Sequence, residues 1–341
     1  MKPRQIKAGI VGAGAIARLH AKCFSAIEDV ELVGVASSSA ERAALNQAHF
    51  DVPVFESYTS ILTNPDIDLV SICNPSGKHL DVALEAARNA KHIICEKPLE
   101  INSERVDSMI KACREAKVKL ACIFQNRFNP EFQRLKSACS KGIFGHLLLA
   151  NAFIPWYRDP SYYSTSDWKG SLAGDGGAAL INQGIHTVDL LLNIMGMPNQ
   201  LMAQVSTMIH DIEGEDLAQA LLQFPQGGRG TILASTCLKP GYPERLEIYG
   251  DKGSAILEGG AIVEWNADEL ISPAESLSGG QSGASDPLAI GHQWHQIQIE
   301  DMIAAIREDR PPLVDGEEGR KSVALIEAIY KAAHEEKMIS F

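Results

Sequence analysis

The sequence contains no apolar run long enough to cross a membrane and no excess of positive charge. A membrane-spanning helix needs about 20 apolar residues, and no stretch of the 341 residues approaches that length. Residues 1–4 lead into a short strand-like run instead of the apolar region of a signal peptide. Acidic residues (43) outnumber basic ones (31), and the net charge of −12 opposes binding to nucleic acid or anionic membranes. We therefore expect a cytoplasmic protein with no nucleic-acid or membrane partner.

Cysteine pairs at disulfide or metal-binding spacing are also missing. The seven cysteines are scattered along the chain and none forms a Cys-x-x-Cys motif, which is typical of reduced thiols in a reducing compartment. Cys73 and Cys95 stand within apolar runs, so we expect them in the core and not as nucleophiles.

What the sequence does contain indicates two domains. Its length is about twice that of a typical domain, and 45% of its residues are hydrophobic, enough for a core in each half. Over residues 1–125, short β-branched runs alternate with amphipathic stretches, which predicts an α/β domain with a doubly wound parallel sheet. The expected strands contain residues 10–11, 32–35, 69–72, 93–94 and 120–123, and the expected helices cover 15–27, 40–49, 78–90 and 102–116.

Residues 126–341 form the second predicted domain. A helix is expected near 131–140, and the strand-like runs after it indicate an open, mostly antiparallel sheet, because few helices intervene. Two closing helices are expected, the second of which could pack back on the first domain, and residues 272–288 have the composition of a loop. The expected strands lie near 147–149, 201–209, 217–224, 229–237, 244–249 and 254–258, and the closing helices near 293–308 and 317–335.

A glycine-rich turn, residues 12–17, follows the first strand and opens the first helix. Gly12 allows a tight turn, Gly14 lets a pyrophosphate approach the backbone, and the final alanine allows close packing. The helix start, with Ala15 and Ile16, would hold the anion through its free amides. The pattern predicts a dinucleotide site, and the alternative is an ordinary glycine-rich turn.

The end of the second strand lacks the acidic residue that commonly binds the adenine ribose of NAD. Ser37 stands there, and Arg42 follows in the next helix, within reach of a 2′-phosphate. We expect NADP or NAD as the cofactor and favour NADP. In the alternative interpretation, Ser38 or Ser39 caps the helix and Arg42 is a surface charge.

Two further turns follow predicted strands at the carboxyl edge of the sheet, where open α/β folds bind ligands. Asn74 and Pro75 begin the first turn, and His79 follows them. Residues 96–98, Glu-Lys-Pro, form the second turn, whose proline stiffens the backbone and can aim Lys97 at a reacting oxygen. Either turn alone fits an ordinary loop, but together with the glycine-rich turn they indicate a site.

In the second domain, a glycine-rich turn at 174–177 leads into a predicted helix with polar residues. Asn182 and His186 are four residues apart, so on an α-helix the amide can orient an imidazole that exchanges a proton with substrate. Gln183 and Asp189 belong to the same helix. His186 could instead be a core residue or a metal ligand, but no second histidine or cysteine stands at ligand spacing, so we expect no metal.

These motifs together resemble the glucose-fructose oxidoreductase/inositol dehydrogenase/rhizopine catabolism (Gfo/Idh/MocA) family. The Gly-x-Gly-x-x-Ala turn, residues 96–98 and residues 176–189 have the family's order and spacing, and residues 310–316 are also similar. The resemblance covers nearly the whole chain. It implies an N-terminal Rossmann domain, a C-terminal α/β domain with an open sheet, and homodimers or homotetramers made through that sheet.

The resemblance also implies an enzyme that transfers a hydride between NAD(P) and a CH–OH group of a sugar, sugar derivative or cyclitol. Many members have aspartate where this chain has Asn182, and members that act on nucleotide-linked sugar acids carry a similar Asn-Gln-Gly-x-His segment. Because an amide does not ionise, Asn182 would orient His186 without raising its pKa. Carried over by position, Lys97 and His186 are the catalytic residues, and Asn74, Pro75 and Glu96 line the nicotinamide end of the cofactor.

An aromatic cluster after the strand near 147–149 suits a sugar substrate, because aromatic rings pack on the apolar face of a pyranose. Core packing or a subunit contact fits the cluster as well. Arg127 could bind a substrate carboxylate or phosphate, or pair with an acidic residue of the protein. The expected substrate residues are Arg127, Trp156, Tyr157, Trp168 and Gln183, beside Arg158, Tyr162, Tyr163 and Lys169.

Two other functions stay open on the sequence. A glycosidase or lyase that recycles tightly bound NAD would retain its cofactor through dialysis. A non-catalytic nucleotide sensor would need neither Lys97 nor His186. The presence of both residues favours the dehydrogenase or reductase.

Overall fold

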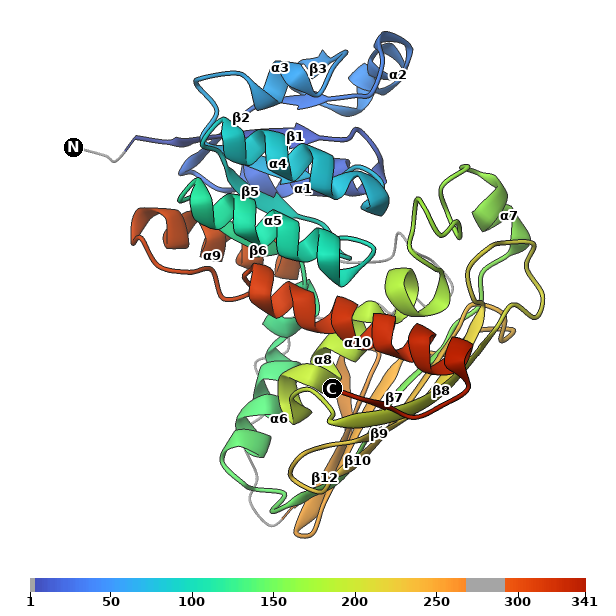
Figure 1. Ribbon diagram of the computed structural model, residues 1–341. Coiled ribbons are helices and arrows are strands. Elements are labelled where there is room, and N and C mark those ends of the chain that lie inside the picture. Colours follow the sequence, from blue (N-terminus) through green and yellow to red (C-terminus); the bar gives the residue numbers. More distant parts are fainter. Residues whose placement is uncertain (1–3, 268–291) are drawn as a thin grey trace. The chain divides into compact units, whose positions relative to one another are not determined.

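The computed structural model describes residues 4–267 and 292–341, so the loop expected at 272–288 lies outside the described residues. The chain divides into two compact units, Met1–Gln125 with His292–Arg320, and Asn126–Gly291 with Lys321–Phe341 (Figure 1). The first change of unit coincides with the expected domain boundary. Residues 292–320 differ from the expectation, because they belong to the first unit and not to the second.

The first unit contains the doubly wound parallel sheet that the sequence predicted, in the order β3-β2-β1-β4-β5-β6. Its strands are β1 (Ile6–Val11), β2 (Val30–Ala36), β3 (Val54–Phe55), β4 (Leu69–Ile72), β5 (His92–Cys95) and β6 (Leu120–Cys122). Its helices are α1 (Ala15–Ala26), α2 (Ala40–Asn46), α3 (Thr59–Leu62), α4 (His79–Arg88), α5 (Ser103–Glu115) and α9 (Gln293–Arg307), with 3₁₀ turns at Gln47–His49 and Ser76–Lys78.

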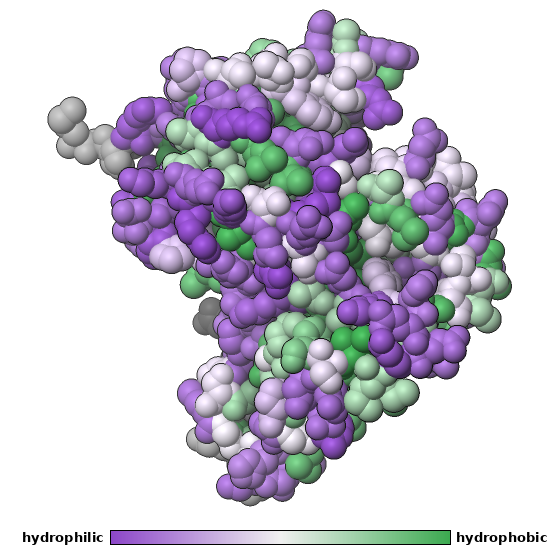
Figure 2. All heavy atoms as spheres, viewed as in Figure 1, coloured by the Kyte–Doolittle hydropathy of each residue, from purple (hydrophilic) through white to green (hydrophobic). Residues whose placement is uncertain are grey.

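Buried strands and capped helices explain why this sequence forms that sheet. All four residues of β4 are buried, as expected for a strand covered on both faces. Ser39 and Asn102 accept hydrogen bonds from backbone amides and so cap the starts of α2 and α5. Hydrophilic side chains gather over α5 in Figure 2, which fits a helix that buries only one side.

Residues 292–320 belong to the first unit because their helix, α9, packs on α1. It lies side by side with α1, although the two helices stand far apart in the sequence (Figure 1). Ile299, Met302 and Ile303 of α9 share a buried cluster with Cys23 and Phe24 of α1. The apolar face of α1 therefore needs a helix from the far end of the chain, and local sequence patterns do not show that requirement.

The second unit contains an eight-stranded, mostly antiparallel sheet in the order β13-β12-β11-β7-β10-β9-β8-β14, and only β7 and β10 pair in parallel within it. Its strands are β7 (Leu147–Pro155), β8 (Gln200–Ser206), β9 (Leu217–Gln223), β10 (Arg229–Ser235), β11 (Arg245–Gly250), β12 (Gly253–Glu258), β13 (Ala261–Asn266) and β14 (Ile339–Ser340). The sequence did not predict β13 or β14.

One face of this sheet is covered and the other is open. Helix α8 packs on β7, and the π-helical segment Ala179–Gly184 packs on β10. Along β9, buried and exposed residues alternate, as expected for a sheet with one covered face. The other helices are α6 (Pro130–Ser140), α7 (Pro160–Ser164), α8 (Ile185–Met195) and α10 (Gly316–Glu335), which begins in the first unit, and a 3₁₀ turn covers Gln125–Phe128.

No helix in the described ranges combines the length and the apolar composition that a membrane span requires.

Candidate functional site

The glycine-rich turn of the first unit has the geometry of an anion-binding helix start. Gly12 has a φ of 103°, and a Cβ there would lie 2.6 Å from the carbonyl of Cys73. A Cβ on Gly14 would meet no atom of residues 4–267 or 292–341 within 4 Å. No side chain in the described part of the chain caps the start of α1, and its first turn contains no acidic residue. The exposed start of α1, with Ala15 and partly buried Ile16, therefore fits a pyrophosphate group.

The end of β2 offers a neutral, buried residue and an exposed cation. Ser37 is 3% exposed, and its backbone amide donates to the carbonyl of Phe55. Arg42 is exposed on α2. Ser39 caps that helix, as the alternative interpretation expected, and this leaves the guanidinium of Arg42 available to a phosphate.

His79 joins the two turns at the carboxyl ends of β4 and β5. Its Nε2 lies 2.9 Å from the carbonyl oxygen of Asn74, and its Nδ1 lies 3.0 Å from that of Pro98. Burial lowers the pKa of His79, although Asn74 and Glu100 oppose this effect. Since both ring nitrogens face backbone carbonyls, His79 supports the turns and is 1% exposed.

The first turn presents a polar atom that a cofactor could use. The Asn74 amide nitrogen donates to the carbonyl of Lys78. Its Oδ1 is buried and has no hydrogen-bond partner among the described residues. A buried acceptor without a partner is costly, so this atom fits a donor group on a ligand.

Lys97 is the partly exposed residue in a buried stretch. Residues 95–100 are all buried except Lys97, and the Lys97–Pro98 peptide bond is cis. The Glu96 carboxylate accepts a hydrogen bond of 3.2 Å from the Lys97 amide. Lys97 is thus the residue of this turn whose side chain is partly open to solvent.

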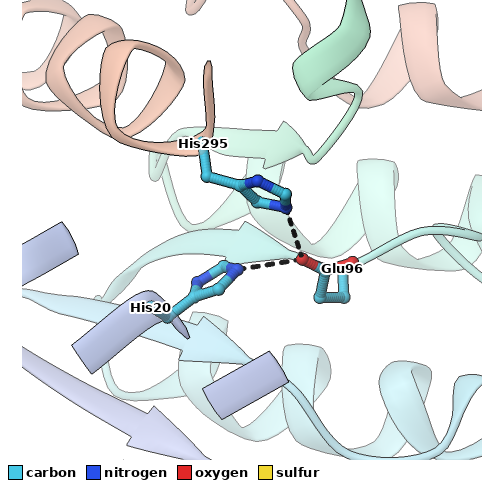
Figure 3. Close-up of side chains that lie close together, drawn as sticks. All are labelled: His20, Glu96 and His295. Carbon is cyan, nitrogen blue, oxygen red and sulfur yellow. Dashed lines mark hydrogen bonds and ion pairs between the residues drawn. The ribbon is translucent and has the colours of Figure 1, made fainter. Parts of the chain in front are cut away.

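Glu96 belongs to a buried cluster with two histidines, His20 from α1 and His295 from α9 (Figure 3). Glu96 Oε1 lies 2.9 Å from His20 Nε2 and 3.8 Å from His295 Nε2. Burial alone would lower the pKa of His20, but Cys73 and Glu96 raise it to about 10. Burial alone would raise the pKa of Glu96, but the hydrogen bond from His20 and the nearby positive charges lower it to about 2. His20 and Glu96 therefore form a buried ion pair.

In the second unit, a hydrogen-bonded polar cluster surrounds Gln183. Its amide oxygen accepts from Arg158 Nη2 at 2.6 Å, and its amide nitrogen donates to Tyr162 and to Asn182 Oδ1. The amide nitrogen of Asn182 donates to Asp175 at 2.5 Å. Asp175 is 1% exposed, so the partner of the Asn182 amide is a buried carboxylate.

The predicted helix that carries Asn182 and His186 has two segments of different type. Asn182 lies in the π-helical segment 179–184, whereas His186 lies at the start of α8. A π-helix has i→i+5 hydrogen bonds in place of the i→i+4 bonds of an α-helix, so the orienting contact between the Asn182 amide and the His186 imidazole stays a prediction. Asp175 and Gln183 are the partners that hold the Asn182 amide.

Glu215 holds the start of the π-helical segment. Its carboxylate accepts from the amides of Ala178 and Leu180 and from the hydroxyl of Tyr330. Burial raises the pKa of Glu215, although these hydrogen bonds oppose the effect. The carboxylate supplies acceptors for amides that the helix start leaves without intrahelical partners.

Arg127 does not offer a free guanidinium to a substrate. Its Nε and Nη2 each donate to Asp189 at 2.7 Å, and both side chains are buried. Asp189 also accepts from Ser322. The structure thus favours the alternative in which Arg127 pairs with an acidic residue, because a bidentate partner already occupies this side of the group.

The aromatic residues expected to bind a sugar divide into buried and accessible ones. Trp156 is 8% exposed, and the Arg158 guanidinium lies 4.9 Å from the centre of its ring. Tyr157 and Trp168 are partly exposed. Lys169 Nζ lies 4.0 Å from the ring centre of Tyr162 and donates to the Tyr162 carbonyl and the Thr165 hydroxyl.

Sequence patterns did not identify several residues that support these groups. His20 meets Glu96 across 76 positions, and Asp175 meets Asn182 across a turn. The glycine-rich turn at 174–177 indicated the contact between Asp175 and Asn182, but no motif or spacing indicated the contact between His20 and Glu96. Lys97 and His186 belong to different units, so their predicted cooperation stays a prediction.

Comparisons with known proteins agree with this architecture. The family model described as "Oxidoreductase family, NAD-binding Rossmann fold" matches residues 6–124, and the model described as "GFO/IDH/MocA C-terminal domain" matches residues 132–256. Inositol 2-dehydrogenase of Rhizobium meliloti (strain 1021) is 28% identical over 348 residues, which cover 98% of this chain and 99% of the relative. The oxidoreductase YrbE of Bacillus subtilis (strain 168) is 30% identical over 260 residues, 74% of this chain and 73% of the relative.

A solved structure matches over almost the full length. The WlbA dehydrogenase from Bordetella pertussis, in complex with NADH and UDP-GlcNAcA, has a TM-score of 0.88 and 31% sequence identity, with 99% of each chain covered.

Proposed function

Since the chain belongs to the GFO/IDH/MocA family of NAD-binding oxidoreductases, we propose that it oxidises a hydroxyl group of a nucleotide-linked sugar acid. The chain is a dehydrogenase of the sugar and cyclitol type by its family and relatives. The observation that carries the narrower substrate class is the full-length similarity to an enzyme solved with UDP-GlcNAcA. The segment Asn182-Gln183-Gly184-Ile185-His186 supports it.

We assign two residues to the reacting carbinol. Lys97 binds the reacting oxygen, because it is the partly exposed residue of a buried turn, and His186 takes the proton. The nicotinamide, when bound, takes the hydride. The lost hydride and proton together balance the change from CH–OH to a carbonyl. Lys97→Met and His186→Asn should each lower kcat by about 10²–10⁴-fold.

Lys169 is the cation that we assign to the substrate carboxylate. The guanidinium groups of Arg127 and Arg158 already face Asp189 and Gln183, whereas Lys169 Nζ donates to neutral oxygens, the carbonyl of Tyr162 and the hydroxyl of Thr165. Burial lowers the pKa of Lys169, with Asp175 opposing, and an incoming carboxylate would favour its charged form.

The experiment that tests the function compares substrates by the rate of NADH or NADPH formation. UDP-GlcNAcA should be oxidised with a kcat/KM at least about tenfold higher than that of UDP-GlcNAc, which lacks the carboxylate. Lys169→Met should remove this preference, whereas Lys141→Met, at an exposed lysine, should keep it. Turnover of myo-inositol but of neither nucleotide sugar would contradict the proposed substrate class.

The cofactor preference is part of the proposal. NADP is favoured over NAD because Ser37 is neutral and Arg42 is exposed beside it on α2. The family and the NADH complex of the relative support a nicotinamide dinucleotide of either kind. A retained cofactor would instead favour the glycosidase or lyase.

We also propose that the open face of the second unit's sheet forms a homo-oligomer interface. Met202 and Leu221 lie opposite each other on β8 and β9 and are 50% and 64% exposed. Adjacent exposed apolar residues on a sheet face favour a protein contact. The seven free cysteines are consistent with a cytoplasmic location.

A further inference from the structure

We propose that His20 is a positioning residue for Lys97, which it holds through the carboxylate of Glu96. This inference rests on the proposed role of Lys97 as a catalytic residue. His20 lies on α1, the helix that begins at the glycine-rich turn, and Lys97 follows β5. The ion pair would therefore join the cofactor-binding helix to the turn that carries the lysine.

The two oxygens of Glu96 make separate contacts. Oε1 accepts a hydrogen bond of 2.9 Å from His20 Nε2. Oε2 accepts a bond of 3.2 Å from the backbone amide of Lys97. A continuous path of hydrogen bonds thus runs from a side chain of α1 to the backbone of Lys97. His20 is 0% exposed and Glu96 is 6% exposed, so water competes little for these bonds.

The surroundings of His20 keep its ring in one orientation. Its Nδ1 lies 2.8 Å from the hydroxyl of Ser71, which in turn lies 3.6 Å from Cys73 Sγ. Phe24 contacts the ring from the same helix, and His295 contacts it from α9. Both ring nitrogens have hydrogen-bond partners, and two aromatic rings lie beside the imidazole. The imidazole is therefore held in one orientation and holds the Glu96 carboxylate in place.

The charges that face the pair come from four elements. Cys73 follows β4, His295 is on α9, and Lys97 and Cys95 flank Glu96 in the chain. His79 on α4 also experiences the charge of Glu96. Removing either member of the pair should therefore change the net charge beside Lys97: loss of His20 leaves more negative charge there, and loss of Glu96 leaves more positive charge.

The same three side chains have ligand atoms within 4.8 Å of one another, but their geometry favours hydrogen bonds over a metal ion. Two ligands on a tetrahedral zinc, with bonds of about 2.0 Å, are separated by about 3.3 Å. His20 Nε2 and Glu96 Oε1 are closer than that, at 2.9 Å, which is an ordinary hydrogen-bond length.

The test uses His20→Gln, Glu96→Gln and the double variant, with His92→Gln as the matched control. Glutamine keeps a donor near the position of Nε2 but removes the charge. His92 lies at the opposite end of β5, where its Nδ1 accepts from the Lys119 amide. We expect His20→Gln to lower kcat by about tenfold or more, with the KM and the Kd for NADH changing less than about threefold. His92→Gln should leave all three constants unchanged.

The pH dependence separates positioning from a general loss of structure. The falling limb of the kcat profile, where the Lys97 ammonium loses its proton, should move to higher pH in His20→Gln and to lower pH in Glu96→Gln, because the two substitutions remove opposite charges. The double variant should lose no more activity than the worse single variant, since both act through one path. The proposal would be overturned if the losses of kcat in the two single variants added up in the double variant, or if this limb of the kcat profile stayed at the wild-type pH in both single variants.

A measurement without turnover keeps this inference separate from the proposed function. The ring ¹⁵N shifts of His20 should be those of an imidazolium at pH 8 in wild type and of a neutral ring in Glu96→Gln. If the wild type oxidises no sugar but shows this change, the proposed substrate fails while the ion pair stands. A neutral His20 ring in the wild type at that pH would refute the ion pair whatever the enzyme's activity.

Discussion

Gly12 and Gly14 stand two residues apart and serve different purposes. Gly12 has a positive φ and no room for a Cβ, because the carbonyl of Cys73 lies 2.6 Å from where that atom would be. Gly14 has a φ of −78° and open space at the Cβ position. The first glycine is therefore needed by the fold, and the second by whatever approaches the start of α1.

Alanine at these two positions should give opposite results. We expect Gly12→Ala to lower the free energy of unfolding by at least about 2 kcal/mol, because it adds backbone strain and a contact with Cys73. Gly14→Ala should leave the thermal midpoint unchanged and weaken NADH binding. Thermal unfolding and fluorescence titration with NADH measure the two effects. A Gly14→Ala variant that binds NADH as tightly as wild type would show that the nucleotide does not approach the backbone at Gly14.

Arg42→Ala tests the cofactor preference. If the exposed guanidinium binds a 2′-phosphate, the substitution should weaken NADPH binding by about tenfold or more and leave NADH binding unchanged. Calorimetric titration of both nucleotides measures the difference. Arg88→Ala, at an exposed arginine that pairs with Glu85 on the same helix, is the control. Equal affinity of the wild type for NADH and NADPH would leave Arg42 as a surface charge.

At the residue scale, the sequence predicted those candidate site residues that belong to a short motif. The glycine-rich turn and the turn around Lys97 can be identified from neighbouring letters. Arg127 was different, because its partner Asp189 lies 62 positions away. A motif shows which residues are available, whereas folding decides which of them are already occupied by a long-range partner.

At the scale of elements, the π-helical segment 179–184 depends on one carboxylate. Glu215 accepts from two amides at its start and from Tyr330 of α10. Glu215→Gln should lower the free energy of unfolding by about 1–3 kcal/mol, since an amide NH₂ would face a backbone N–H. It should also lower kcat, because His186 directly follows this segment. Glu213→Gln, at an exposed neighbour, should change neither quantity.

The raised pKa of Glu215 gives this comparison a pH dependence. A buried carboxyl with a raised pKa binds its proton more tightly in the folded state, so its contribution is largest at low pH. This contribution to stability is lost as the pH rises from the ordinary glutamate pKa of 4.5 through the raised pKa of Glu215. The stability of wild type relative to Glu215→Gln should therefore decline over that window in urea unfolding at successive pH values. A difference that grows with pH would mean that the pKa is lowered.

The elements that the sequence predicted are those with a long periodic pattern. Helices α1, α5 and α9 and most strands have the expected places. The two-residue strands β3 and β14 are too short for a period, and they exist because a neighbouring strand pairs with them. The π-helical segment was predicted as part of an α-helix because the two share the same composition.

At the scale of the whole molecule, Leu221 tests the proposed oligomer. Leu221→Glu should dissociate it, because a carboxylate would be buried in an apolar contact without a partner. Light scattering coupled to gel filtration measures the mass. Leu45→Glu, at a leucine that is 70% exposed in the first unit, is the control. A monomeric wild type would remove the proposed interface.

The membership of residues 292–320 in the first unit is the large-scale feature that the sequence did not predict. The boundary after residue 125 is visible as a change in pattern, but the membership of residues 292–320 is not. Their helix α9 has the same amphipathic pattern whichever core it covers. It packs in the first unit because its buried residues join a cluster with Cys23 and Phe24 of α1.

The late position of α9 has a consequence for the nascent chain. On a ribosome the first unit emerges early, yet α9 follows only after residues 126–291 have been made. At about 5–20 residues per second, that interval lasts roughly 8–35 s. During this time α1 presents Cys23 and Phe24 without their α9 cover, a surface that a chaperone can bind. The protein therefore completes its first unit among the last steps of its synthesis.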